Sequence, residues 1–269
     1  MRDVAYWPRT FLDEIEQPLG GEALVLWALG GPSFVLRTPE TTIWVDPYFY
    51  GTPDDAVPGA YRATAIPIKP DEVRIADIVI STHDHVDHCH EGTLLPLLAN
   101  TEAFCVAPQS SAKLMRDWGV ADERIRQVGP GDGVEFRDVR ISVHPSYDPN
   151  EPYAVTLVVL VGGTTLFVSG DTSQGPALSE IGQSYDLDYA LLAFGRTWYM
   201  DEEQLIEAAR ALRPRTLLPF HWEFWRNHTG DIARLFEIYH REQPPFELEI
   251  LLVGDSLRLT KSGQDGAPA

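Results

Sequence analysis

The segment Ser81–His88 contains the spacing His-x-His-x-Asp-His, and residues 77–80 before it have the composition of a short buried strand. The four candidate metal ligands in this segment are His83, His85, Asp87 and His88. In an extended chain, residues two apart point to the same side, so His83 and His85 are expected to bind one ion. The pair that follows is expected to turn toward a second ion. Imidazole and carboxylate ligands suit zinc, manganese or iron.

A chance cluster of histidines on a loop is the competing interpretation. Half of the eight histidines of the chain fall between His83 and His90, which argues against chance. Three more residues of ligand type end candidate core strands: His144, Asp171 and His221. Each could instead be an ordinary turn or surface residue. Asp46, at the end of a strand over 42–46, could orient a histidine ligand or cap the turn before Pro47, and the sequence supports both roles equally.

The arrangement of strands and helices predicts an α/β (α+β) fold. Strands over 23–27, 33–37 and 42–46 form a meander, after which strands and helices alternate. The stretch 41–46 resembles 164–171, which indicates an internal duplication. Two such halves would build a four-layer αββα sandwich with the site at the sheet edges. We expect one domain over 1–260, a disordered tail over 261–269, a helix capped by Thr93 and a strand over 247–253.

Composition excludes several classes of partner. The net charge of −19 would be repelled by a nucleic-acid backbone or an anionic membrane, so neither is expected as the main partner. The longest strongly apolar run, 155–161, is far shorter than the roughly 20 residues of a membrane helix. The two cysteines form no close pair, and the N-terminus has no continuous apolar core. We therefore expect a cytoplasmic protein.

Taken together, these motifs resemble the metallo-β-lactamase superfamily, and within it the L-ascorbate-6-phosphate lactonase branch. The stretches that carry the resemblance are Ser81–His88, Trp118-Gly119-Val120, Gly131-Asp132, Ser169-Gly170-Asp171 and Pro219-Phe220-His221-Trp222. The resemblance implies the four-layer αββα metallo-β-lactamase sandwich and two divalent ions, zinc or manganese with iron as an alternative. It assigns His83, His85 and His144 to the first ion, and Asp87, His88 and His221 to the second. Asp171 would bridge the two ions, and Asp148 competes with His144.

The implied reaction is hydrolysis by a water activated between the two cations. If only one ion binds, Asp87 could act as a general base. The implied substrate is a lactone or a phosphate-containing small molecule, with Arg196 as its cationic contact. Aromatic side chains could line the cleft, with Tyr147 and Trp222 as the predicted substrate contacts and Trp198, Tyr199 and Trp225 beside them.

The chain departs from the lactonase pattern at Pro149–Pro152, where the longer basic segment of that branch is replaced. Ascorbate-6-phosphate itself is therefore not the expected substrate. Two alternatives stay open: a phosphodiesterase of the kind that cleaves N-acyl phosphatidylethanolamine, and a metal-binding module without turnover. The sequence also leaves the oligomeric state open, including a homo-oligomer.

Overall fold

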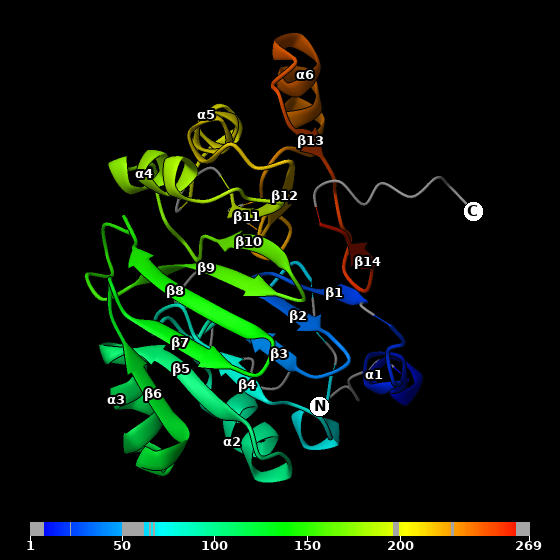
Figure 1. Ribbon diagram of the computed structural model, residues 1–269, viewed down its shortest axis with the longest axis vertical. Helices are drawn as coiled ribbons and strands as arrows, with labels where there is room; N and C mark the ends of the chain where they lie inside the picture. The colour runs from blue at the N-terminus through cyan, green and yellow to red at the C-terminus, as the bar shows by residue number, and fades with distance from the viewer. Residues whose placement is uncertain are drawn as a thin grey trace.

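The computed structural model describes residues 8–21, 23–49, 62–64, 66, 68–195, 199–226 and 229–261. Two seven-stranded sheets lie face to face, with helices on both outer sides (Figure 1). The predicted four-layer αββα sandwich is therefore confirmed. The predicted tail over 261–269 lies outside the described residues except for Lys261. The single-domain boundary at 260 stays a prediction.

The first sheet has the order β14-β1-β2-β3-β4-β5-β6. Its strands are β1 (Leu24–Gly30), β2 (Ser33–Arg37), β3 (Thr42–Val45), β4 (Ile78–Ile80), β5 (Phe104–Pro108), β6 (Ile125–Val128) and β14 (Ser256–Leu259). The pairings from β14 to β3 are antiparallel, and those from β3 to β6 are parallel.

The second sheet has the order β13-β12-β11-β10-β9-β8-β7. Its strands are β7 (Gly133–Phe136), β8 (Val139–Pro145), β9 (Val155–Val161), β10 (Thr164–Val168), β11 (Tyr189–Ala193), β12 (Thr216–Phe220) and β13 (Glu247–Leu248). Here the pairings from β7 to β10 are antiparallel, and those from β10 to β13 are parallel. The two sheets thus change from antiparallel to parallel at matching strands, β3 and β10. This match agrees with the similarity between 41–46 and 164–171.

Helices cover the two outer faces. The helices are α1 (Arg9–Glu16), α2 (Glu91–Asn100), α3 (Gln109–Asp117), α4 (Pro176–Ser184), α5 (Glu202–Leu212) and α6 (Ile232–Glu242), with short 3-10 turns at Pro70–Glu72 and Asp122–Arg124. The first three pack on the first sheet and the last three on the second. A third apolar layer lies between the sheets and draws side chains from both. Within each buried strand, alternate residues face the inner layer and the helices, as Ile43 and Trp44 do.

Two local predictions differ from the structure, and one helix was not predicted. Helix α2 begins at Glu91, two residues before Thr93, because the Thr93 hydroxyl lies 2.8 Å from His90 Nδ1 and accepts from the Phe49 amide instead. Helix α4 was not predicted. The strand expected over 247–253 stops at Leu248, because the chain then crosses to the first sheet, where the Gly254 amide donates to the Ala28 carbonyl.

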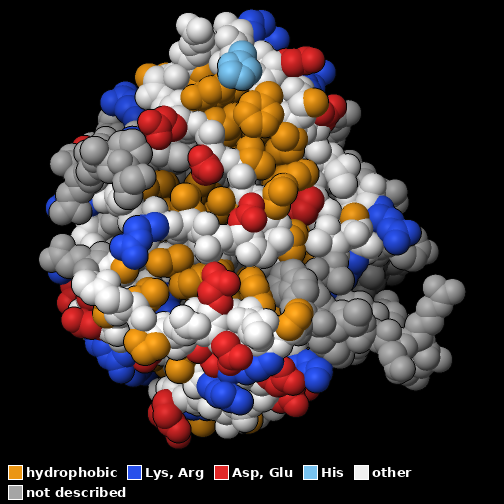
Figure 2. Space-filling view, turned by 90° about the vertical axis from the view of Figure 1, so that its right-hand side faces the viewer, with side chains coloured by type: hydrophobic (Ala, Val, Ile, Leu, Met, Phe, Trp, Pro, Cys, Tyr) orange, Lys and Arg blue, Asp and Glu red, His pale blue; other side chains and the backbone are white. Residues whose placement is uncertain are grey.

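The outer surface mixes acidic and basic side chains on the face shown in Figure 2, and hydrophobic side chains gather in its upper part. Phe236 of α6 and Leu252 are exposed over 38% and 58% of their surfaces. No helix in the described ranges is long and apolar enough to cross a membrane.

Candidate metal centre

His88 lies at the centre of the predicted site and is completely buried. Its Nδ1 is 2.8 Å from Asp46 Oδ2. Asp46 also accepts hydrogen bonds from the amide and the hydroxyl of Thr82, both at 2.8 Å. These bonds fix the ring orientation and leave Nε2 of His88 pointing to the other side. Of the two roles considered for Asp46, the structure supports the one that orients a histidine.

Asp171 faces His88 from that other side. Its Oδ1 lies 3.3 Å from His88 Nε2 and 3.7 Å from His221 Nε2, while its Oδ2 lies 3.7 Å from His83 Nε2. One carboxylate therefore presents an oxygen to each half of the site, as a bridging ligand must. Gly170 makes this approach feasible: it has a φ of +51°, and a Cβ there would lie 2.9 Å from Thr82 Oγ1.

Asp87 and His221 form one half of the site together with His88. His221 Nε2 lies 3.2 Å from Asp87 Oδ2, and Trp225 Nε1 donates to the same oxygen at 3.2 Å. The Tyr199 hydroxyl lies 3.1 Å from His221 Nε2. His221 follows β12 in a left-handed conformation with a φ of 64°, an unusual backbone state that functional sites often hold.

The other half contains His83 and His85, whose Nε2 and Nδ1 atoms are 2.9 Å apart. Asp148 reaches these two side chains: the ligand atoms of all three lie within 4.8 Å of one another. Two further groups meet the same criterion, one made of His83, His88 and Asp171, the other of Asp87, His88 and His221. Among the described residues, His144 belongs to none of these groups. Its ring packs edge-on against Tyr185 at 5.5 Å.

The residues present fit a pair of cations. His88 Nε2 and Asp171 Oδ1 are buried and face each other, yet neither makes a hydrogen bond. A buried polar atom without a partner costs about 1–3 kcal/mol, so such atoms are rare unless a ligand satisfies them. Nitrogen and carboxylate donors that converge in this way suit zinc, manganese or iron.

The carboxylates and imidazoles of the site shift each other's pKa values. Burial raises the pKa of Asp171, but His88 and His221 outweigh it and lower the pKa to about 2. Burial likewise opposes ionisation of Asp87, and its histidine neighbours again lower the pKa far below the usual range. Both carboxylates are therefore ionised and ready to hold a cation at neutral pH.

A pocket of about 200 Å³ opens beside these groups. Its described lining is His85, Asp87, Asp148, Asn150, Asp171, Tyr199 and Trp225. Within this described lining there are four groups of acidic or imidazole type and two aromatic rings, but no lysine or arginine. The pocket therefore offers both candidate ion positions to a small molecule.

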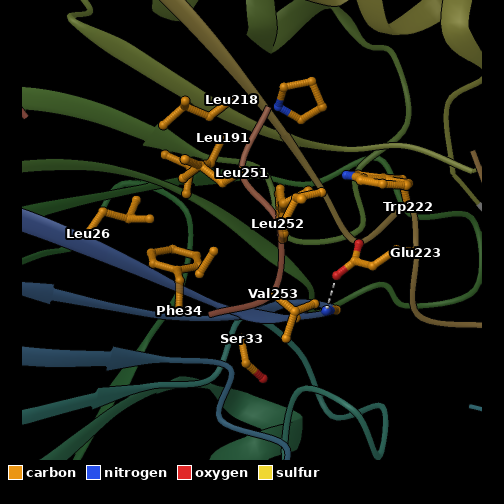
Figure 3. A pocket seen from close by; sticks show the side chains of 15 residues that line it. Leu26, Ser33, Phe34, Leu191, Leu218, Trp222, Glu223, Leu251, Leu252 and Val253 are labelled. Atoms are coloured by element: carbon orange, nitrogen blue, oxygen red, sulfur yellow. Dashed lines mark hydrogen bonds between the residues drawn. The ribbon is translucent and has the colours of Figure 1, made fainter. Parts of the chain in front are cut away.

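Two of the three predicted substrate contacts, Tyr147 and Trp222, do not line this pocket. Arg196 and Trp198 lie outside the described residues. The Tyr147 ring covers Gly175, and its hydroxyl accepts from the Ala177 amide at the start of α4, so it supports that helix. Trp222 lines a separate apolar cavity of about 30 Å³, where Glu223 accepts a hydrogen bond from the Gly31 amide (Figure 3). Tyr199 and Trp225 are the aromatic residues that line the pocket by the ligands.

The predicted ligands lie in a part of the chain that matches a known protein family. A family model described as "Beta-lactamase superfamily domain" matches residues 41–222, which include every predicted ligand. The chain belongs to the metallo-β-lactamase superfamily. The match begins at β3 and ends just after His221, so it covers the strand ends that carry the site.

Individual relatives agree with this assignment. The protein named "Probable L-ascorbate-6-phosphate lactonase UlaG" from Escherichia fergusonii is 26% identical over 196 residues, which is 63% of this chain and 55% of that protein. The chain thus spans about half the length of the curated relatives it matches.

Two solved structures share the fold. One is Igni18, described as a novel metallo hydrolase from Ignicoccus hospitalis, with a TM-score of 0.70 and 19% identity over 88% of this chain and 99% of that chain. The other is an isothiocyanate hydrolase from Delia radicum gut bacteria, with a TM-score of 0.70 and 19% identity over 87% of this chain and 98% of that one. At these identities the likeness supports the fold. The family match and the shared fold thus agree on the superfamily.

Proposed function

We propose that this protein is a metal-dependent hydrolase and that it cleaves a small lactone or ester in the pocket beside His85 and Asp171. The observation that carries the proposal is the position of the pocket, whose lining includes ligand-type residues from both halves of the site. Two divalent ions, zinc or manganese or iron, are part of the proposal. The other partner is the small-molecule substrate, and the expected location is the cytoplasm.

The side chains have separate tasks in this proposal. His83 and His85 would hold one ion, Asp87, His88 and His221 would hold the other, and Asp171 would be shared between them. Bound ions of this kind supply a nucleophile at neutral pH and polarise the scissile carbonyl. Asp46 keeps His88 in the required orientation through the 2.8 Å contact. If a single ion binds, Asp87 takes the role of general base.

Tyr199 is the best-placed group for the substrate oxygen. Its hydroxyl lines the pocket and lies 3.1 Å from His221 Nε2. Burial first, and the nearby Asp171 and Asp87 next, raise the pKa of Tyr199 well above its ordinary value. The hydroxyl therefore keeps its proton and can donate a hydrogen bond to the oxygen on which negative charge develops.

The charge of the lining supports an uncharged substrate over a phosphorylated one. The described lining contains three carboxylates and no cationic side chain that could pair with a phosphate. Any phosphate group would have to rely on the ions alone. We therefore place lactones and esters ahead of phosphate esters, and the membrane phospholipids of the phosphodiesterase alternative after both.

The test is a substrate panel with and without metal. The protein is stripped with a chelator, then reloaded separately with zinc, manganese or iron, and assayed on lactones, carboxylic esters and bis(p-nitrophenyl) phosphate. We expect hydrolysis to fall by about 10³-fold on stripping and to return on reloading, with lactones or esters cleaved faster than the phosphodiester. Equal turnover by the stripped and reloaded protein would contradict the proposal. A faster phosphodiester reaction would overturn its substrate class.

A further inference from the structure

We propose that Asp148, and not His144, completes the half of the site that contains His83 and His85. This inference rests on the proposed metal-dependent function and concerns the composition of its metal site. Each half would then consist of two histidines and one aspartate, with Asp171 shared between them. We call the set His83, His85 and Asp148 the first subsite, and the set Asp87, His88 and His221 the second subsite.

His83, His85 and Asp148 lie close together. The ligand atoms of His83, His85 and Asp148 lie within 4.8 Å of one another, which one ion can span. His83 is completely buried, and its Nε2 lies 2.9 Å from His85 Nδ1 and 3.7 Å from Asp171 Oδ2. Asp148 lines the same pocket as His85 and Asp171. The carboxylate therefore closes the open side of the histidine pair.

The His144 side chain points away from the layer between the sheets. In strand β8, Val139, Ile141 and Val143 belong to the layer between the sheets. Because side chains alternate along a strand, Arg140, Ser142 and His144 point to the opposite face. There the His144 ring meets Tyr185, which directly follows α4. Pairing with Thr156 of β9 holds the His144 backbone in this register.

The loop after β8 brings Asp148 to the pocket. Strand β8 ends at Pro145, and the loop that follows is held by the Tyr147 amide, which donates to Thr172 Oγ1 at 2.8 Å. Thr172 is the next residue after the bridging Asp171. Asp148 Oδ1 accepts from the Asn150 amide at 2.8 Å. The contact with Thr172 holds the loop beside Asp171. The contact with Asn150 sets the direction of the Asp148 carboxylate.

The exchange of an imidazole for a carboxylate changes which ions the site prefers. With Asp148, the two subsites together offer four imidazoles and, counting Asp171, three carboxylates. Oxygen ligands favour harder ions, so this set should prefer manganese or iron(II) to zinc more strongly than a set with His144 would. The two subsites also become chemically alike, so both should fill with the same metal.

The experiment counts ions in three variants of the full chain. Each is stripped, reloaded with excess manganese or zinc, desalted and measured by mass spectrometry of its metal content. We expect about two ions in the wild type and in the His144→Ala control, but about one in Asp148→Ala, with affinity for the lost ion reduced by more than about 100-fold. In Asp148→His, two ions should return and the ratio of zinc to manganese affinity should rise by at least about tenfold.

The outcomes separate this inference from the proposed function. Loss of an ion in His144→Ala, alone or together with Asp148→Ala, would overturn the assignment, as would two tightly bound ions in Asp148→Ala. If the wild type itself takes up no divalent ion, the proposed function fails as well. Thermal melting of the stripped proteins tests folding, and Asp148→Asn provides a second, isosteric variant should the alanine variant melt early.

Discussion

Asp46 and Asp171 occupy matching positions in the two sheets, but they make different contacts. Each lies directly beyond the strand at which its sheet changes from antiparallel to parallel, Asp46 after β3 and Asp171 shortly after β10. Both contact the same ring, that of His88, from opposite sides. Asp46 reaches Nδ1 at 2.8 Å, and Asp171 reaches the neighbourhood of Nε2 at 3.3 Å.

The difference lies in what surrounds each carboxylate. Both oxygens of Asp46 have hydrogen-bond partners, Thr82 for Oδ1 and Thr82 and His88 for Oδ2. Asp171 has a buried Oδ1 with no hydrogen-bond partner, and it contacts three histidines from both halves of the site. The two matching strand ends thus place one aspartate where it orients His88 and the other where it faces histidines from both halves of the site.

Asp171→Asn gives the largest expected effect. The amide keeps the size of the side chain but removes the charge that would face both ions. We expect kcat for the best substrate to fall by about 10³-fold, with loss of at least one ion. Steady-state kinetics and metal analysis check this. Turnover close to that of the wild type would show that the bridging role does not belong to Asp171.

Asp46→Asn tests the other side of the same ring. The variant keeps a hydrogen-bonding side chain but loses the charged acceptor for His88. Removal of such a supporting carboxylate commonly costs 10–100-fold in metal affinity, roughly, so we expect weaker metal binding with full activity at saturating metal. Competition with a chromophoric chelator measures the affinity. If Asp46→Asn lowered kcat at saturating metal as much as Asp171→Asn, the distinction between the two aspartates would be lost.

The strand ends that carry these two aspartates could be predicted from the sequence, because buried strands and turn residues leave clear local patterns. Thr41–Asp46 and Thr164–Asp171 are similar enough to reveal the matching places, and His83–His88 reveals its own spacing. Val139, Ile141 and Val143 alternate with polar residues, and this pattern already indicates that His144 points away from the layer between the sheets. The prediction of His144 as a ligand did not take this pattern into account.

The pocket could be predicted only in part: of the aromatic residues expected in a cleft, Tyr199 and Trp225 line it and Tyr147 and Trp222 do not. Tyr199 and Trp225 come from segments that follow β11 and β12, and their contact with His221 and Asp87 depends on how these segments fold over the sheet edge. The sequence marks such side chains as aromatic but does not give their direction. Because the direction of a side chain cannot be read from the sequence, Tyr147 and Trp222 were predicted as substrate contacts. In the structure the Tyr147 ring packs against Gly175, and Trp222 lines the separate cavity together with Glu223.

Thr82→Val gives the smallest expected effect and sharpens the comparison furthest. Valine keeps the branched shape that fits against Gly170, but it cannot donate the 2.8 Å hydrogen bond to Asp46 Oδ2. The Thr82 amide still donates to Asp46 Oδ1, and His88 still contacts Oδ2. We expect the stripped protein to lose about 1–2 kcal/mol of unfolding free energy and metal affinity to fall by less than about tenfold, with kcat unchanged at saturating metal.

Thr82→Ser is the matched control for this variant, because serine keeps the hydroxyl and loses only a methyl group. Denaturant unfolding of the stripped variants, together with chelator competition, separates the two changes. The serine variant should hold metal as tightly as the wild type. A loss of metal affinity in the serine variant, with none in the valine variant, would mean that the packing of Thr82 against Gly170, and not its hydrogen bond, keeps Asp46 and His88 aligned. In that case the close approach of the two sheet edges would hold Asp46 in place. The contrast with Asp171 would then be steric in origin.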